Sequence, residues 1–253
     1  MTASTMLAFD LGASGGRAVL GRFDGERLSC EEVSRFENGC REENGFLRWD
    51  VPGLFERMKD AFRVCKTPAS FGIDSWGVDY GLLDKDGRLL SNPRAYRAAG
   101  NREMLRAWER VSRRTLFYRT GIAANNFNTS YQLYRRVLEG DGELARAETM
   151  LLIPDLLGYL FTGEKATEYT NATTTGLLRA ETKCWDLPTV RELGLPERIL
   201  THIDFPGRMR GALLPSLRAE LGVGKVPFAA VGTHDTASAV AAIPGEGSFA
   251  FCS

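Results

Sequence analysis

The sequence has no excess of charge of either sign and few residues of the kinds that build metal centres or disulfide frameworks. Lys and Arg together number 32, as do Asp and Glu, so the formal net charge is zero. This balance argues against a general affinity for nucleic acid or anionic membrane. The five cysteines are odd in number, scattered and without metal-ligand spacing. With neither a signal peptide nor a transmembrane run, we expect a cytoplasmic protein with no membrane or nucleic-acid partner.

The composition that is present is ordinary for a globular enzyme. Apolar residues make up 43% of the 253 positions and charged residues 25%. This length allows one large domain or two modest ones, with enough apolar material for a buried core. There is no internal repeat and no low-complexity tract.

A glycine-rich hairpin near the start is the first candidate site. The apolar run Met6–Phe9 leads into Asp10, and a tight loop with Gly12, Gly15 and Gly16 precedes a second strand-like run over 18–23. Glycines allow positive φ and close backbone approach, so such a loop can direct several N–H groups into one concave space.

The polar residues of this hairpin suit a phosphate chain. Ser14 supplies a hydroxyl and Arg17 a fixed positive charge. Asp10, at the end of the first strand, could hold a magnesium ion through water. The alternative is a hairpin with a solvated Arg and an Asp in its turn, because glycine loops are common.

Further along, apolar spacing predicts an α/β chain with a helical segment near 100–180. Asp50 is a plausible N-cap for a helix that follows it, and 71–76 reads as a buried strand. Hydroxyl- and amide-rich residues over 168–175 are either a capped loop or a polar lid. The other expected elements are strands over 28–36, 80–84, 88–90, 226–231 and 247–252, and helices over 104–115, 129–138, 155–161, 214–221 and 237–243.

The second candidate site is Thr233-His-Asp-Thr236, at the start of a predicted small-residue helix. A carboxylate in the first helical turn is stabilised as the anion, so Asp235 either caps the helix or acts as a base. Phosphoryl transfer depends more on positioning than on base strength, so an ordinary aspartate would serve to deprotonate a sugar hydroxyl. His234 could donate to a sugar oxygen, or it could be structural.

The third candidate site is Asp74-Ser-Trp-Gly-Val-Asp79, at the carboxyl end of a predicted buried strand, where open α/β sheets place ligands. Gly77 would allow close approach of a substrate, Trp76 could stack on a sugar face, and Asp79 could accept from hydroxyls. The alternative is a tight crossover with Trp76 in the core.

Together these motifs resemble the amino-terminal domain of the rhamnulokinase branch of the FGGY carbohydrate kinases, and the resemblance runs through the whole chain. The residues that carry it are 10–17, 44–50, 72–79, 128–133, 168–175 and 234–239. It implies a ribonuclease-H-like α/β domain of the actin and hexokinase superfamily, a mixed sheet flanked by helices with a helical insertion near 100–180. The domain would span residues 1–253.

The resemblance also implies an activity, which is ATP-dependent phosphorylation of L-rhamnulose at its 1-hydroxyl. Transferred by motif, Ala13, Ser14, Gly15, Gly16 and Arg17 would contact ATP, and Asp10 would lie near Mg²⁺. The ketose would meet Gly77, His234, Asp235 and Thr236, with Asp235 as proton acceptor; Asn128 and Tyr131 are looser candidates for the sugar rim.

Two departures from the family pattern leave alternatives open. Relatives tend to carry an acidic residue after the Tyr-Arg pair, where this chain has Ala98; a related kinase for L-fuculose or a pentulose therefore stays possible. The family continues past residue 253 into an adenosine-binding domain that we expect to be the partner of this one. Without it, the chain would be inactive in transfer or a non-catalytic sugar-binding module.

Overall fold

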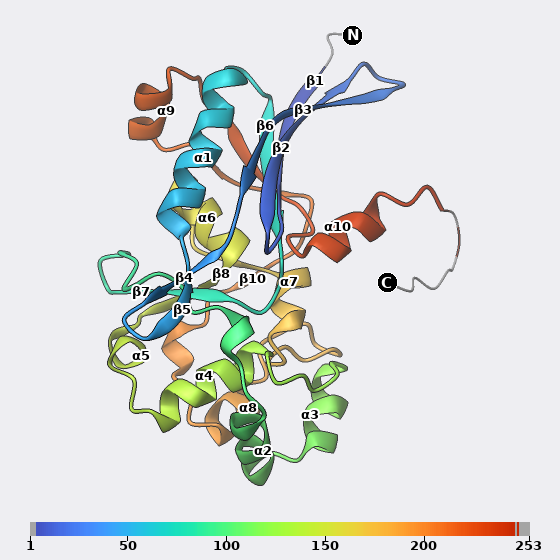
Figure 1. Cartoon of the computed structure of the whole chain (residues 1–253). Helices are drawn as coiled ribbons and strands as arrows, with labels where there is room; N and C mark the ends of the chain where they lie inside the picture. The colour runs from blue at the N-terminus through green and yellow to red at the C-terminus, as the bar shows by residue number, and fades with distance from the viewer. Residues whose placement is uncertain (1–3, 246, 248–253) are drawn as a thin grey trace.

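The computed structural model describes residues 4–245 and 247. A mixed six-stranded sheet lies at one end of the molecule and a group of helices at the other, with α10 (Asp235–Ala241) beside the sheet (Figure 1). The predicted α/β class with a helical insertion is therefore confirmed. Within the described residues, no helix is both long and apolar enough to cross a membrane.

The sheet is built around the predicted hairpin. Its order is β11-β12-β6-β1-β2-β3. Strands β1, β2 and β3 form an antiparallel meander, whereas β6 runs parallel to both β1 and β12. The bounds are Ser4–Leu11 for β1, Gly15–Phe23 for β2, Leu28–Glu37 for β3, Ser70–Ser75 for β6, Arg208–Ala212 for β11 and Pro227–Ala230 for β12.

Three helices pack on one face of this sheet and close the first core (Figure 1). They are α1 (Val51–Val64), α6 (Ile153–Thr162) and α9 (Pro215–Leu221). The predicted cap is confirmed, because the Asp50 side chain accepts a hydrogen bond from the Gly53 amide. The alternating inward residues of β1 and β6, such as Phe9 and Ile73, are completely buried against these helices.

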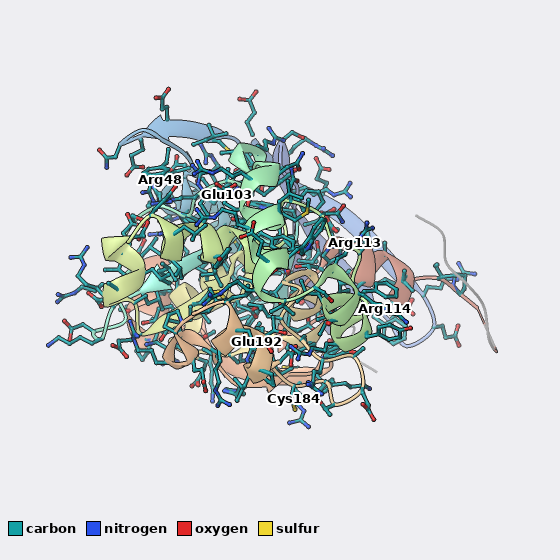
Figure 2. The ribbon with its side chains drawn as sticks, turned by 90° about the horizontal axis from the view of Figure 1, so that it is seen from below. Arg48, Glu103, Arg113, Arg114, Cys184 and Glu192 are labelled. Carbon is teal, nitrogen blue, oxygen red and sulfur yellow. The ribbon has the colours of Figure 1, made fainter. Side chains whose placement is uncertain are left out.

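A second core lies under the sheet and contains most of the helical insertion. Its elements include β7 and β8, which pair antiparallel, and a group of helices. Figure 2 shows these helices from below, with Arg113 and Arg114 on the exposed surface. The bounds are Tyr80–Leu83 for β7, Asn101–Arg110 for α2, Arg113–Thr120 for α3, Thr129–Leu138 for α4, Gly142–Arg146 for α5, Thr149–Leu152 for β8 and Leu187–Glu192 for α8.

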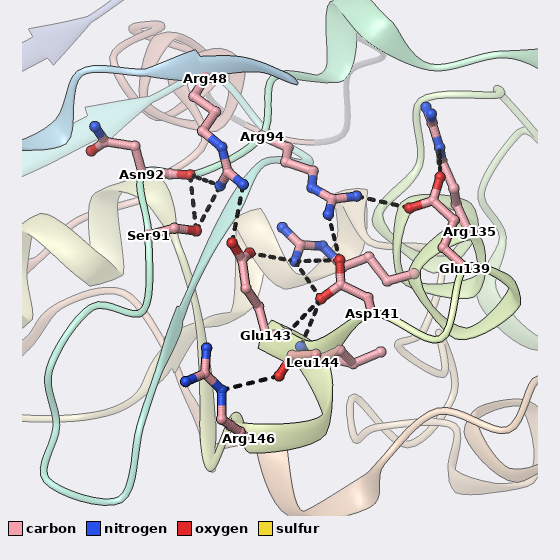
Figure 3. Close-up of polar contacts among 12 residues, drawn as sticks. Arg48, Ser91, Asn92, Arg94, Arg135, Glu139, Asp141, Glu143, Leu144 and Arg146 are labelled. Atoms are coloured by element: carbon pink, nitrogen blue, oxygen red, sulfur yellow. Dashed lines mark hydrogen bonds and ion pairs between the residues drawn. The ribbon is translucent and has the colours of Figure 1, made fainter. Parts of the chain in front are cut away.

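Ion pairs connect Arg48 and Arg94 to the helical end of the molecule (Figure 3). The guanidinium of Arg48, only 3% exposed, donates to the Glu143 carboxylate at 3.0 Å, and Arg136 donates to the same carboxylate at 2.8 Å. Arg94 pairs with Asp141 and lies 3.6 Å from the centre of the Phe46 ring. The hairpin of β4 (Cys40–Glu43) and β5 (Phe46–Trp49) is thereby fixed to α5.

Several expectations need correction. The single helix predicted over 104–115 is wrong, because Ser112 caps a new helix by accepting from the Thr115 amide. The polar stretch after residue 37 forms the β4–β5 hairpin, turned by Asn44 and Gly45 with positive φ. Residues 168–175 contain β9 (Thr167–Glu168) and the short helix α7 (Tyr169–Thr174), with β10 (Ile203–Asp204) paired to β9. The strand predicted over 247–252 lies outside the described residues, apart from Gly247.

Candidate active site

The loop between β1 and β2 opens onto a hollow of about 480 Å³. Gly12 and Gly15 close the loop with a 2.7 Å backbone hydrogen bond, and the side-chain amide of Asn38 donates to the Gly12 carbonyl at 2.8 Å. The hollow is lined by Asp10, Gly12, Ser14, Gly15, Gly16, Arg17, Arg35, Phe36 and Glu37. Ala13 does not line it and packs toward the first core.

The glycines of this loop serve close packing. None of Gly12, Gly15 and Gly16 has the positive φ that the sequence suggested. A Cβ on Gly16 would lie 2.4 Å from the Phe36 ring, and one on Gly15 would lie 3.2 Å from the Phe36 carbonyl. The two glycines therefore let β3 approach the loop closely.

Asp10 and Arg17 face each other across the β1–β2 ladder. The Arg17 guanidinium donates to Oδ2 of Asp10 at 2.8 Å from Nε and lies 2.6 Å from it through a second nitrogen. Both side chains are partly exposed, so the pair lies at the rim of the hollow. An arginine and a carboxylate at one rim can meet an anionic phosphate chain and its cation.

Asp74 is the last residue but one of β6 and is in register with Asp10 of the neighbouring strand β1. Burial, together with the nearby carboxylates of Asp10 and Asp235, raises the pKa of Asp74 to about 7, although a hydrogen bond from Ser238 acts to lower it. Asp74 thus lies between the first and second candidate sites. Sequence analysis assigned it no role, although two aspartates at the ends of predicted strands were a signal.

We expect Asp74→Asn to stabilise the chain in a pH-dependent way. A carboxyl whose pKa is raised on folding binds its proton more tightly in the folded state, so the free energy of unfolding falls as pH rises from about 4 to about 7. The amide avoids this loss. Because Asp74 is only partly buried, we expect the variant to gain about 2 kcal/mol at about pH 8 and nothing at about pH 4. Urea unfolding at the two pH values, in buffer that contains a metal chelator, measures the difference in unfolding free energy between the variant and the parent chain. An equal difference at both pH values would contradict the prediction.

The second and third candidate sites meet at Gly77 and His234. The Ser75 amide donates to the Thr233 carbonyl at 2.9 Å, and Ser75 and His234 form an isolated parallel bridge. A Cβ on Gly77 would lie 3.0 Å from Cδ2 of His234 and 2.8 Å from the Thr174 side chain. A larger residue at this position would force the Thr174 side chain to move and would crowd the histidine.

Asp235 begins α10, immediately after His234. Its Oδ1 accepts from the Thr236 amide at 2.6 Å and from the Thr236 hydroxyl at 3.2 Å. Nδ1 of His234 lies 3.5 Å from the same oxygen. The carboxylate is 44% exposed, and its Oδ2 has no hydrogen-bond partner among the described residues. One oxygen is thus held by the protein while the other can meet a ligand.

The side chains of Trp76 and Asp79 point into the protein. Asp79 is completely buried and accepts hydrogen bonds from the indoles of Trp49 at 2.6 Å and Trp76 at 3.1 Å. It also accepts from the Tyr96 amide and the Gln132 side chain, each at 3.2 Å. Burial raises the pKa of Asp79 to about 6 in spite of these four donors. The geometry matches the alternative interpretation, in which Trp76 belongs to the core.

Val78 has the left-handed backbone that branched side chains rarely adopt, with φ of 68°. Its amide donates to the Thr174 hydroxyl at 3.0 Å. Its carbonyl accepts from the Thr129 hydroxyl at 2.6 Å and from Gln132 at 3.2 Å. Side chains from α4 and α7 therefore hold this conformation, which places Gly77 against His234.

The residues present fit a magnesium ion carried by a nucleotide. No group of three His, Cys, Asp or Glu side chains that could hold a metal exists among residues 4–245 and 247. Magnesium usually keeps several waters and binds one or two carboxylates together with substrate phosphates. Asp10, which shares one oxygen with Arg17, could supply such a water-mediated contact.

Comparison with known proteins identifies the family. Residues 5–242 match the model of the FGGY family of carbohydrate kinases, N-terminal domain. The chain is 39% identical to a rhamnulokinase of Bacteroides thetaiotaomicron over 97% of its own length and 52% of the relative's. A rhamnulokinase of Oceanobacillus iheyensis is 38% identical over 94% of the chain and 52% of that relative. The chain thus spans about half the length of these curated relatives.

Solved structures support the same fold. A gluconate kinase from Lactobacillus acidophilus superimposes with a TM-score of 0.78 at 18% identity, over 92% of this chain and 48% of that one. A carbohydrate kinase from Novosphingobium aromaticivorans gives 0.78 at 24% identity, over 95% and 50%. The fold is therefore the actin and hexokinase-like fold predicted from the sequence. The chain belongs to the FGGY family of carbohydrate kinases.

Proposed function

We propose that this chain is the sugar-binding half of a cytoplasmic kinase that transfers the γ-phosphoryl group of ATP to the 1-hydroxyl of L-rhamnulose. The observation that carries the proposal is the close approach of His234 to Gly77, where a Cβ would lie 3.0 Å from the imidazole and 2.8 Å from the Thr174 side chain. At this contact the His234 side chain is 26% exposed and the Asp235 carboxylate 44% exposed. We call the surface formed by Gly77, His234, Asp235 and Thr236 the sugar space. The similarity to rhamnulokinases supports L-rhamnulose as the sugar.

In this proposal each group has a defined role. Oδ2 of Asp235 accepts the proton of the sugar hydroxyl as its oxygen forms a bond to the γ-phosphorus, and the bond from phosphorus to the bridging oxygen breaks to release ADP. Gly77, His234 and Thr236 contact the ketose. The side chains of Trp76 and Asp79 support that contact from the side that faces the core.

The nucleotide would lie over the loop of residues 13–17. Arg17 and the loop amides of Ser14, Gly15 and Gly16 would contact phosphate oxygens, with Ala13 contributing backbone only. Asp10 would hold Mg²⁺ through water, and the ion would neutralise charge on the phosphates. A second domain, which the relatives' greater length supports, would bind adenosine and exclude water on closure.

One observation favours a second candidate substrate. Ala98 is exposed and carries no polar side chain where relatives tend to have an acid, so one sugar contact would be missing. L-fuculose or a pentulose is the alternative ketose, and a non-catalytic sugar-binding module is the alternative role.

Calorimetric titration of this chain with L-rhamnulose, L-fuculose, D-xylulose and glycerol tests the proposal. We expect selective binding of L-rhamnulose and at least a tenfold loss of affinity in His234→Ala, because a hydrogen bond to a sugar hydroxyl is removed. His202→Ala, which changes an exposed histidine away from this space, should bind as the parent chain does. If the chain prefers another ketose, L-rhamnulose is not its substrate. If it binds none of the four compounds, the proposed sugar site is wrong.

A further inference from the structure

Glu168 is a completely buried carboxylate to which the proposed mechanism gives no role. It lies at the junction of β9 and α7, and its backbone amide donates to both oxygens of the buried Asp155 at 3.2 Å. Asp155 is in turn paired with Arg210 at 2.6 Å. Glu168 is thus held by a rigid, internal set of contacts rather than by solvent.

The side chain of Glu168 contacts the segment that carries the candidate base. Its Oε2 accepts from the Thr233 amide at 3.0 Å and from the Thr233 hydroxyl at 2.8 Å. The same oxygen accepts from the Thr170 hydroxyl at 2.5 Å, and that hydroxyl accepts from the His234 amide at 3.3 Å. One carboxylate therefore fixes Thr233 directly and His234 through Thr170.

The same short helix also holds the other side of the sugar space. Thr174, the last residue of α7, accepts from the Val78 amide and packs against Gly77. Glu168, as the N-cap, accepts from the amides of Thr170 and Asn171 and so determines where α7 begins. The two loops that meet at the sugar space are therefore bound to opposite ends of one helix.

The following inference rests on the proposed function. We propose that Glu168 is a positioning residue for the sugar site, because through Thr233 and α7 it sets the distance between Gly77 and the pair formed by His234 and Asp235. Glu168 does not touch the sugar. Its carboxylate is required because both of its oxygens accept from donors at this junction. An amide would place an N–H against a donor, at Thr233 in one orientation or at the Thr170 amide in the other.

The test compares Glu168→Gln with Asp141→Asn in this chain. Asp141 is a matched control, because it is also a buried carboxylate that caps a short helix, α5, and accepts from two amides. It contacts neither loop of the sugar space. If Glu168 positions the site, Glu168→Gln weakens L-rhamnulose binding at least tenfold. Asp141→Asn should lose as much thermal stability as Glu168→Gln but bind L-rhamnulose as the parent chain does. Normal binding by a folded Glu168→Gln would overturn the proposal.

A second measurement needs no ligand. Selective ¹⁵N-histidine labelling gives two amide signals, since the sequence has two histidines. Hydrogen exchange of the His234 amide should accelerate at least tenfold in Glu168→Gln and stay unchanged in Asp141→Asn; unchanged exchange in both would overturn the proposal. If Glu168→Gln does not fold, Thr233→Val replaces it in this test, since it removes only the hydroxyl contact to Glu168. The proposal then requires faster exchange of the His234 amide in Thr233→Val. Should the parent chain bind no sugar, the proposed function fails while this exchange still decides the role of Glu168.

Discussion

Asp235→Asn should lower phosphoryl transfer by about 10²- to 10⁴-fold, the usual contribution of a general base, when this chain is joined to the second domain proposed above. The amide can still accept from the Thr236 amide through Oδ1, so the local backbone is expected to stay as it is. What it cannot do is accept a proton at the second oxygen. The rate of ADP release in the presence of L-rhamnulose measures the effect.

Calorimetry distinguishes loss of the base from loss of the site. We expect Asp235→Asn to bind L-rhamnulose within a few-fold of the parent protein, because the ground-state hydrogen bond is kept in part. Asp86→Asn, at an exposed turn, is the matched carboxylate control and should transfer at the parent rate. Near-normal turnover by Asp235→Asn would remove this residue from the mechanism.

Asp79→Ala should cost about 3–5 kcal/mol of unfolding free energy near neutral pH, the largest stability effect expected for this chain. The change leaves the indoles of Trp49 and Trp76, the Tyr96 amide and the Gln132 side chain without their shared acceptor in a completely buried place. Each buried donor that loses its partner costs about 1–3 kcal/mol. Denaturant unfolding of the 253-residue chain measures the loss.

Trp76→Phe provides the graded comparison. It removes one donor and leaves Asp79 with its three other partners, so we expect a loss of about 1 kcal/mol. If Asp79→Ala cost no more than Trp76→Phe, the four donors would not depend on this carboxylate, and its proposed supporting role would be lost.

The sequence predicted the parts of this protein that are encoded locally. Apolar alternation and the Asp50 cap identified β1, β2, β3, β6 and α1, because inward and outward positions repeat with the period of each element. The helix break at Val111 and Ser112 was missed, since apolar spacing continues across it and the cap at Ser112 is a common residue type.

The candidate site was harder to predict because its residues act over long separations. His234 and Asp235 were found from their motif, but their contact with Gly77 depends on sheet order, which no local pattern specifies. A tryptophan and an aspartate at positions 76 and 79 are compatible both with a sugar site and with a place in the core. Only the hydrogen-bond donors around Asp79 distinguish these two possibilities. Glu168 was assigned only to a segment that could be a capped loop or a polar lid, because its partner Thr233 lies 65 positions away.

Val78 has a consequence for the order in which this protein folds. The local sequence does not favour its left-handed backbone, and the three side chains that hold it come from 51, 54 and 96 positions further along the chain. Closing loops over such separations costs conformational entropy, and the local contacts that form early in folding do not offset this cost. The turn at Val78 should therefore reach its native form only after α4 and α7 have docked, so that the sugar space is among the last parts of the chain to assemble.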